Sequence, residues 1–141
     1  MKLKNELEEI IRMSKLIDKF GDEHNITPDT LYEINLALEE ILTNIISYGF
    51  EDKLKHNIFI EGHLHNNILK IKIEDDGIAF DPLSIKEPDL ESNIEERQIG
   101  GLGIHLVKTL MQNISYLREN EKNVLILEKL LKCTEDLIPI K

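Results

Sequence analysis

Hydrophobic positions repeat with two different periods along the chain and divide it into helical and extended segments. Over residues 3–20 the apolar side chains recur every three or four positions, which predicts an amphipathic helix that ends at Gly21. A longer helix is predicted over residues 28–48, because Thr27 can cap its start, Pro28 suits its first position, one apolar stripe runs along it and Gly49 follows its end. The chain is therefore expected to begin almost directly with a helix.

Alternation of apolar and polar residues predicts strands in the second half of the chain. Residues 57–64 and 68–75 are expected to form an antiparallel pair with one buried face. Apolar positions over residues 104–114 predict a third helix, and residues 114–118 and 123–130 predict a closing hairpin. This order favours an α+β fold, a two-layer α/β sandwich in which a mixed sheet carries helices on one face.

Composition and charge indicate a single cytoplasmic domain over residues 1–141. The chain is 41% hydrophobic and 31% charged, which is enough to bury a core at this length. It has no run of about 18 apolar residues and no apolar signal-peptide segment at its start. The net charge of −10 opposes non-specific binding to nucleic acid, so we expect neither a nucleic acid nor a membrane as partner. The single cysteine, Cys133, has no second cysteine with which to pair.

The stretch before the third helix lacks any hydrophobic period. Residues 83–98 are mostly polar, and so long a segment inside a compact domain is typical of a functional lid or of a disordered segment. We place a flexible lid at about residues 83–100. Three of the seven glycines follow, at Gly100, Gly101 and Gly103. They indicate either a phosphate site at a helix N-terminus or a flexible loop that enters a helix.

Two polar patterns could carry chemistry. Glu40 and Asn44 are four residues apart on the second helix and therefore project from the same side, although such pairs often belong only to a solvated face. Asp75 ends a predicted strand and is followed by Gly77, which is typical either of a surface turn or of a fixed carboxylate that a flat ring can approach.

Taken together, three segments resemble the GHKL ATPases, the gyrase and histidine-kinase type. The segments are "EEILTNIISYGF", "IEDDGIAFDP" and "GGLGIHLVKTLM", in the order and at the spacing of the family's N, G1 and G2 boxes. The chain is most similar to the small anti-sigma-factor serine kinases, which share Asp-x-Gly-x-x-Phe-Asp-Pro, Gly-Leu-Gly and a final strand like "NVLIL". The resemblance covers about residues 29–129 and implies the Bergerat ATP-binding fold.

The resemblance implies roles for individual residues. Asn44 resembles the residue that binds Mg²⁺, and Glu40 resembles the general base. Asp75 resembles the acid that recognises adenine, Gly77 resembles the glycine against which the base packs, and Phe80 belongs to the same box. The remaining implied cofactor-binding residues are Gly100, Gly101, Leu102, Gly103 and Ile104.

The chain departs from the family pattern in four places. Ala79 stands where many relatives have glycine, and no basic residue stands at the glycine cluster, so Lys86 or Arg97 of the lid would have to reach the γ-phosphate. The strand that usually precedes the first helix is not expected. Arg12 is the one basic residue that resembles, by rough position, the family's partner-binding arginine.

Two functions of different classes follow from the resemblance. The first is a Mg-ATP-dependent serine/threonine protein kinase that sequesters a partner such as a sigma factor and phosphorylates its anti-sigma antagonist, with a homodimer left open. The second is an ATP-gated protein-binding module without catalysis. A fragment of a sensor histidine kinase is disfavoured, because no paired helices with a phosphoacceptor histidine precede the ATP-binding part. His56, His63 and His65 are interpreted as surface residues, since no cysteine or carboxylate completes a metal-ligand spacing around them.

Overall fold

The computed structural model describes residues 1–84 and 101–131, apart from the side chains of residues 101 and 102. Nearly all of the expected lid therefore lies outside the described residues. The elements in chain order are β1 (Lys2–Lys4), α1 (Glu9–Glu23), α2 (Pro28–Tyr48), β2 (Asn57–His65), β3 (Ile68–Asp75), the short 3-10 helix η1 (Pro82–Ser84), α3 (Gly101–Leu110), β4 (Asn113–Glu119) and β5 (Lys122–Leu130).

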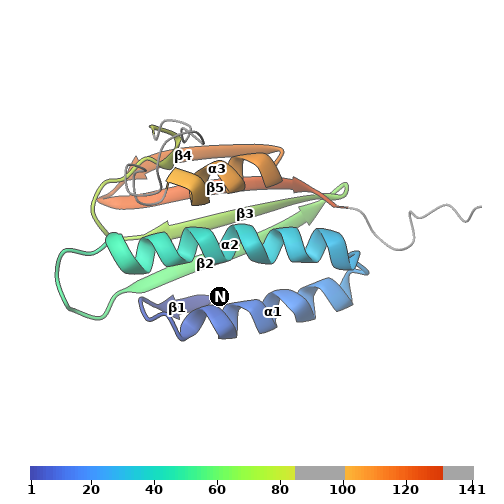
Figure 1. Ribbon diagram of the computed structural model, residues 1–141, viewed down its shortest axis with the longest axis horizontal. Coiled ribbons are helices and arrows are strands. Elements are labelled where there is room, and N and C mark those ends of the chain that lie inside the picture. The colour runs from blue at the N-terminus through green and yellow to red at the C-terminus, as the bar shows by residue number, and fades with distance from the viewer. Residues whose placement is uncertain (85–100, 132–141) are drawn as a thin grey trace, which may run out of the picture.

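The strands form one sheet, and the helices lie on one of its faces (Figure 1). The strand order is β1-β2-β3-β5-β4, and each pairing among the described residues is antiparallel. The two-layer α/β sandwich is confirmed. The prediction of a mixed sheet is wrong, because β2–β3 and β4–β5 are hairpins and β5 runs antiparallel to β3.

The chain begins with a strand, which the sequence analysis did not predict. Lys2–Lys4 pairs with the edge of β2, where Leu3 lies opposite Ile58 and is only 1% exposed. α1 starts at Glu9, so the helix predicted from residue 3 was too long at its N-terminal end. An apolar residue such as Leu3 fits a helical or an extended period equally well, and its pairing with β2 decides between them.

Gly21 lies inside α1, although the sequence predicted that it ends the helix. α1 continues to Glu23. A Cβ atom at Gly21 would lie 2.8 Å from side-chain atoms of Leu31 in α2, which is closer than real Cβ contacts. The glycine therefore allows the two helices to approach one another.

The second predicted helix is confirmed at both ends. Thr27 is the N-cap of α2, and its Oγ1 accepts a hydrogen bond from the backbone N–H of Thr30 (3.4 Å). At the other end, the N–H of Gly49 donates to the carbonyl of Ile45 (2.8 Å). Buried residues of α2 form the centre of the core, together with one face of the sheet and Met13 of α1. Its fully buried members include Ile34, Leu38, Leu42, Ile58, Ile73 and Leu127.

Both predicted hairpins are confirmed. Asn66 and Asn67 join β2 to β3 with φ of 51° and 63°, and Asn120 and Glu121 join β4 to β5 with φ of 52° and 61°. Two consecutive residues at positive φ suit the right-handed twist of a tight hairpin, and asparagine tolerates this conformation better than most residues.

The third helix begins and ends earlier in the chain than predicted, since it starts at Gly101. α3 ends at Leu110, and Ile114 already belongs to β4. Lys129 of β5 is 5% exposed and donates to the carbonyl of Leu110 and to the carboxylate of Glu33 in α2. This buried ammonium group caps the C-terminus of α3, where positive charge is favourable, and fixes α3 relative to α2.

Candidate functional site

A cavity of about 190 Å³ opens between α2, α3 and the C-terminal end of β3. Most of its wall is hydrophobic, with Ile41 and Ile45 from α2, Ile104 from α3 and Leu125 from β5. The polar residues on the wall include Asn44, Asp75 and Asn123. A mostly apolar cavity with a few convergent polar groups is the usual form of a small-molecule site.

Asp75 is the buried acid of this cavity. It is 5% exposed, and its Oδ1 accepts hydrogen bonds from the N–H of Gly77 (2.9 Å) and from Nδ2 of Asn123 (3.0 Å). Burial raises the pKa of Asp75 above its ordinary value, and these two hydrogen bonds oppose that shift because they stabilise the charged form. The neighbouring Asp76 also raises the pKa, and Arg118 lowers it.

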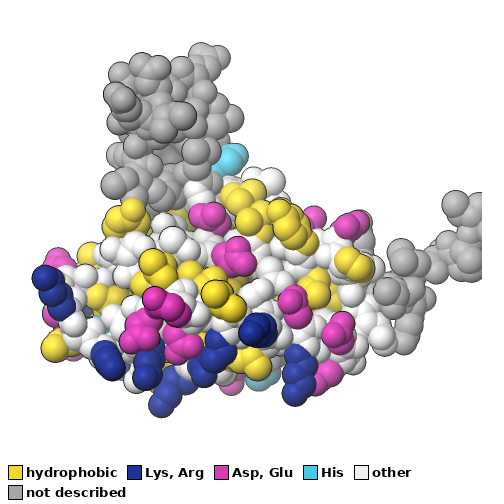
Figure 2. All heavy atoms as spheres, turned by 60° about the horizontal axis from the view of Figure 1, so that its bottom comes forward, with side chains coloured by type: hydrophobic (Ala, Val, Ile, Leu, Met, Phe, Trp, Pro, Cys, Tyr) yellow, Lys and Arg dark blue, Asp and Glu magenta, His cyan; other side chains and the backbone are white. Residues whose placement is uncertain are grey.

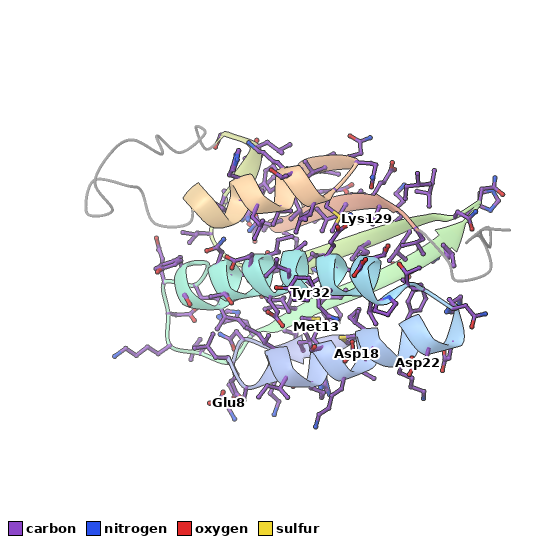
Figure 3. All side chains as sticks on the ribbon, turned by 45° about the vertical axis from the view of Figure 1, so that its right-hand side comes forward. Glu8, Met13, Asp18, Asp22, Tyr32 and Lys129 are labelled. Atoms are coloured by element: carbon purple, nitrogen blue, oxygen red, sulfur yellow. The ribbon has the colours of Figure 1, made fainter. Side chains whose placement is uncertain are left out.

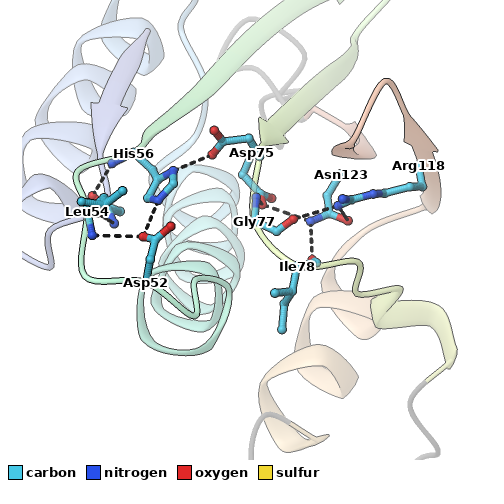
Figure 4. A network of polar contacts seen from close by, with 10 residues as sticks. Asp52, Leu54, His56, Asp75, Gly77, Ile78, Arg118 and Asn123 are labelled. Carbon is cyan, nitrogen blue, oxygen red and sulfur yellow. Dashed lines mark hydrogen bonds and ion pairs between the residues drawn. The ribbon is translucent and has the colours of Figure 1, made fainter.

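Asn123 holds Asp75 in place, and the sequence analysis gave it no site role. Its Oδ1 accepts from the hydroxyl of Tyr116 (2.5 Å), from Nη1 of Arg118 (3.1 Å) and from the N–H of Phe80 (3.3 Å). These donors fix the orientation of the amide, so Nδ2 must point to Asp75 and to the carbonyl of Ile78 (2.8 Å) (Figure 4). A polar residue at the start of the apolar strand "NVLIL" was the available signal.

The turn after β3 contacts the end of α2. A Cβ atom at Gly77 would lie 2.3 Å from the carbonyl oxygen of Gly49, and the same oxygen accepts from the N–H of Ile78 (2.8 Å). Nη1 of Arg118 also donates to the carbonyl of Gly77 (2.9 Å). Gly77 is required here because two backbone segments meet, and this contact forms one edge of the cavity.

Glu40 and Asn44 lie beside the first turn of α3. A Cβ atom at Gly103 would lie 2.5 Å from Oε2 of Glu40 and 3.7 Å from Nδ2 of Asn44. Asn44 lines the cavity, and Glu40 stands one turn before it on α2. The structure thus brings the two predicted residues of α2 together with a predicted glycine of α3.

The other predicted cofactor-binding residues divide into two groups. Phe80, which is 47% exposed, and Ile104, which is 3% exposed, both line the cavity. Gly101 and Leu102 form the start of α3, so the glycine cluster belongs to the helix as much as to a loop. Gly100 lies outside the described residues, as do Lys86 and Arg97 of the expected lid.

His56 forms a cluster next to the cavity rather than an isolated surface position. Its Nε2 lies 2.7 Å from Oδ1 of Asp52 (Figure 4). Its Nδ1 lies 3.0 Å from Oδ1 of Asp76, and its ring stacks on Phe50. The hydrogen bond with Asp52 is the largest cause of a raised pKa of His56. No group of three metal-ligating side chains occurs in residues 1–84 and 101–131.

Arg12, the residue proposed for partner contact, holds β1 and α1 together. Its Nε lies 3.0 Å from Oε2 of Glu9, and Nη2 donates to the carbonyl of Lys2. Over the part of the chain that the structure describes, none of the helices has the length and apolar content needed to span a bilayer.

Comparison with known sequences identifies a domain family and a group of distant relatives. A family model described as histidine kinase-like ATPase domain matches residues 3–129. The serine-protein kinase RsbW of Listeria innocua is 27% identical over 90 residues, which are 61% of this chain and 57% of that protein. RsbW of Bacillus thuringiensis is 28% identical over 102 residues, 70% of this chain and 63% of that protein. The matches span about three fifths of the length of these relatives.

Solved histidine kinase structures share the fold at low sequence identity. The blue-light activated histidine kinase of Erythrobacter litoralis EL346 aligns with a TM-score of 0.56 and 20% identity, covering 79% of this chain and 34% of that one. The histidine kinase AdeS of Acinetobacter baumannii aligns with a TM-score of 0.52 and 16% identity, covering 93% of this chain and 68% of that one.

Proposed function

The chain belongs to the histidine kinase-like ATPase family, and from that premise we propose that it is a Mg-ATP-dependent serine/threonine protein kinase. The observation that carries the proposal is the buried carboxylate of Asp75 at one end of a hydrophobic cavity, with Asn44 and Glu40 beside the start of α3. The cavity offers a place for a purine ring, and the helix start offers a place for its phosphates.

Adenine would bind between the apolar walls of the cavity. Within the described residues, the two hydrogen bonds to the carboxylate of Asp75 end on Oδ1. We assign Oδ2 to the exocyclic amino group of adenine, which donates an N–H hydrogen bond that an ionised carboxylate accepts. A charge-assisted hydrogen bond of this kind contributes about 1.5–3 kcal/mol.

The phosphates would lie at the N-terminus of α3. Backbone N–H groups and the helix dipole favour negative charge there, and Gly103 leaves space beside Asn44. The amide oxygen of Asn44 suits Mg²⁺, which prefers oxygen ligands and takes its remaining ligands from water and from the nucleotide phosphates. The bound ion would supply charge neutralisation at the transferred phosphoryl group.

Glu40 is the residue of this group that could accept a proton. Phosphoryl transfer depends mainly on positioning and on stabilisation of charge, so a carboxylate near the phosphates can orient a serine or threonine hydroxyl and accept its proton. A Cβ atom at Gly103 would lie 2.5 Å from Oε2 of Glu40, and this closeness to the start of α3 supports a role for Glu40 at the phosphate end.

The proposed substrate is a regulatory protein. Two relatives carry the name serine-protein kinase, and the resemblance to anti-sigma-factor kinases favours a sigma factor and its antagonist as partners. A cytoplasmic location and a homodimer belong to the same proposal.

Thermal unfolding with and without Mg-ATP tests the nucleotide site. Ligand at about 100 times its dissociation constant adds roughly 2.7 kcal/mol, which should raise the midpoint by several degrees. The shift should vanish in Asp75→Asn and persist in Glu61→Gln, which removes a carboxylate from the exposed side of β2. A nucleotide-independent midpoint, with no heat of binding in calorimetry, would contradict the proposal.

Phosphotransfer to a purified antagonist protein tests the chemistry. Glu40→Ala should lower the rate by about 10²–10⁴-fold while Mg-ATP still raises the unfolding midpoint. An unchanged rate would remove Glu40 from the mechanism. Nucleotide binding without any phosphotransfer would instead support the ATP-gated binding module.

A further inference from the structure

A second concave surface lies between the outer sides of α1 and α2. This groove has a volume of about 370 Å³, and no residue that lines it also lines the nucleotide cavity. Its α1 side contains Ser14 and Asp18, and its α2 side includes Tyr32, Asn35 and Glu39. Figure 3 shows Tyr32 on α2 and Asp18 on the neighbouring α1.

The charge in the groove has one sign. Asp18 and Glu39 line it, whereas its described lining includes no Lys, Arg or His side chain. Asp22 follows Asp18 by one helical turn and extends the acidic row along α1 (Figure 3). Figure 2, which turns α1 toward the viewer, shows acidic and hydrophobic side chains mixed over the middle of the molecule and basic ones gathered along its lower edge.

One amide at the groove has an unused acceptor. Nδ2 of Asn35 donates to Oδ1 of Asp18 (3.0 Å), and this bond fixes the orientation of the amide because a flipped amide would face the carboxylate with its oxygen. Oδ1 of Asn35 is then buried and has no hydrogen-bond partner, and no other buried side-chain atom in residues 1–84 and 101–131 shares this condition. An unpaired buried acceptor of this kind is uncommon in folded proteins.

Large hydrophobic side chains border the same surface. Tyr32 is 68% exposed and Ile11 is 63% exposed. Ile11 precedes Ser14 by three residues and Asp18 by seven, so it lies on the groove side of α1. Exposed aromatic and aliphatic side chains next to buried polar groups are typical of protein interfaces.

We propose that this groove binds a positively charged amphipathic helix of a protein partner. Lysine or arginine side chains would pair with Asp18 and Glu39, and apolar side chains would cover Tyr32 and Ile11. This is the helix-in-groove mode of recognition, with charge giving the selectivity. The inference goes beyond the proposed kinase activity and does not depend on it, because the groove and the nucleotide cavity have separate linings.

The test uses the full chain and a synthetic amphipathic helical peptide with leucines on one face and lysines along its flanks. A matched peptide has glutamate in place of each lysine. Amide chemical shifts of the ¹⁵N-labelled protein are followed during titration. We expect the lysine peptide to perturb amides around Asp18, Tyr32 and Asn35, and the glutamate peptide to leave them unchanged.

Two matched variants remove the same amount of charge at different places. Asp18→Asn with Glu39→Gln should weaken binding of the lysine peptide by about tenfold, and Glu119→Gln with Glu121→Gln, at the β4–β5 turn, should change it by less than about twofold. Thermal unfolding of each variant confirms that it folds. If a variant does not fold, the amide chemical shifts of the wild-type protein alone show whether the lysine peptide binds in the groove.

Three results would overturn the inference. Shifts confined to another surface, or equal binding of both peptides, would remove the groove as a basic-helix site. Concentration-dependent dimerisation that Tyr32→Ser abolishes, measured by sedimentation velocity, would identify a second copy of the chain as the occupant. Each result leaves the Mg-ATP unfolding test untouched, so failure of the groove and failure of the nucleotide site are distinguishable.

Discussion

Asp75 is a residue whose position opposes its own ionisation. Burial raises its pKa because it penalises the charged carboxylate. The amide of Asn123 and the N–H of Gly77 oppose this rise in pKa by donating hydrogen bonds to Oδ1. A carboxyl group with a raised folded-state pKa adds stability below its unfolded pKa, and that contribution is lost as pH rises through the folded pKa. At neutral pH the ionised Asp75 therefore destabilises the nucleotide-free fold. Binding sites commonly contain residues of this kind, which lower stability in exchange for function.

Replacement of Asp75 by asparagine should separate stability from binding. The amide introduced by Asp75→Asn can accept both donated hydrogen bonds through its oxygen and carries no charge to bury. We expect the unfolding midpoint of the nucleotide-free protein at pH 7 to rise by roughly 2–5 °C, while Mg-ATP no longer raises it. Calorimetric scans at pH 7 and pH 4 measure both effects. A midpoint below that of the wild type at pH 7 would contradict the cost assigned to the carboxylate.

Packing of α3 against α2 brings the proposed base, Glu40, next to the proposed phosphate site at the start of α3. Gly103 of α3 leaves room for the carboxylate of Glu40, because a Cβ atom at this position would lie 2.5 Å from its Oε2. Lys129 fixes the other end of α3 through Leu110 and Glu33. The helix pair is thus held at both ends by contacts of different kinds. The N-terminal contact depends on the absence of a side chain, and the C-terminal one on a buried charge.

Gly103→Ala should lower activity without lowering stability. The new methyl group would lie 2.5 Å from Oε2 of Glu40, so the flexible side chain of Glu40 must turn away from the proposed phosphate site. Alanine favours a helix over glycine by about 1 kcal/mol, which offsets the displacement. We expect an unchanged or slightly higher unfolding midpoint and at least about a tenfold loss of phosphotransfer. Thr109→Ala, at the exposed far end of α3, is the control, and full activity of Gly103→Ala would show that Glu40 acts from another position.

At the scale of the whole molecule, His56 connects segments of the chain that are distant in the sequence. It links the segment after α2, through Asp52, to the end of β3, through Asp76, and its backbone N–H donates to Asn5 near β1 (2.9 Å). The hydrogen bond between the side chains of His56 and Asp52 is the largest cause of a raised pKa of His56 and of a lowered pKa of Asp52. The stability from His56 is present below its unfolded pKa and is lost as pH rises through its folded pKa. The stability from Asp52 is present above its unfolded pKa and is lost as pH falls through its folded pKa.

The fold should therefore be more stable at pH 6 than at pH 8. We expect the unfolding midpoint of the nucleotide-free protein to fall across this interval, and His56→Gln to flatten the profile mainly by lowering the midpoint at pH 6. His63→Gln, whose side chain in the wild type is 69% exposed, should keep the slope. Equal slopes in wild type and His56→Gln would exclude His56 as the source.

Local chemistry made much of the fold predictable. The apolar stripe of α2, its cap at Thr27 and the asparagine turns act over a few residues, so the sequence shows them directly. The candidate nucleotide-binding segments were also visible, because glycines and polar residues interrupt hydrophobic periods there. Their adjacency was implied only by the resemblance to the GHKL ATPases. In the structure, Asp75 and Asn44 line one cavity and Gly103 lies beside Asn44.

Tertiary structure alone decided the features that depend on contacts distant in sequence. Leu3 became part of a strand because the edge of β2 was open to pair with it, and Gly21 became a helix contact because Leu31 packs there. Asn123 became a partner of Asp75, 48 residues away, because β3 and β5 are neighbours in the sheet. Propensity and period describe a residue's own segment, whereas a buried polar group is satisfied by whatever the fold brings to it.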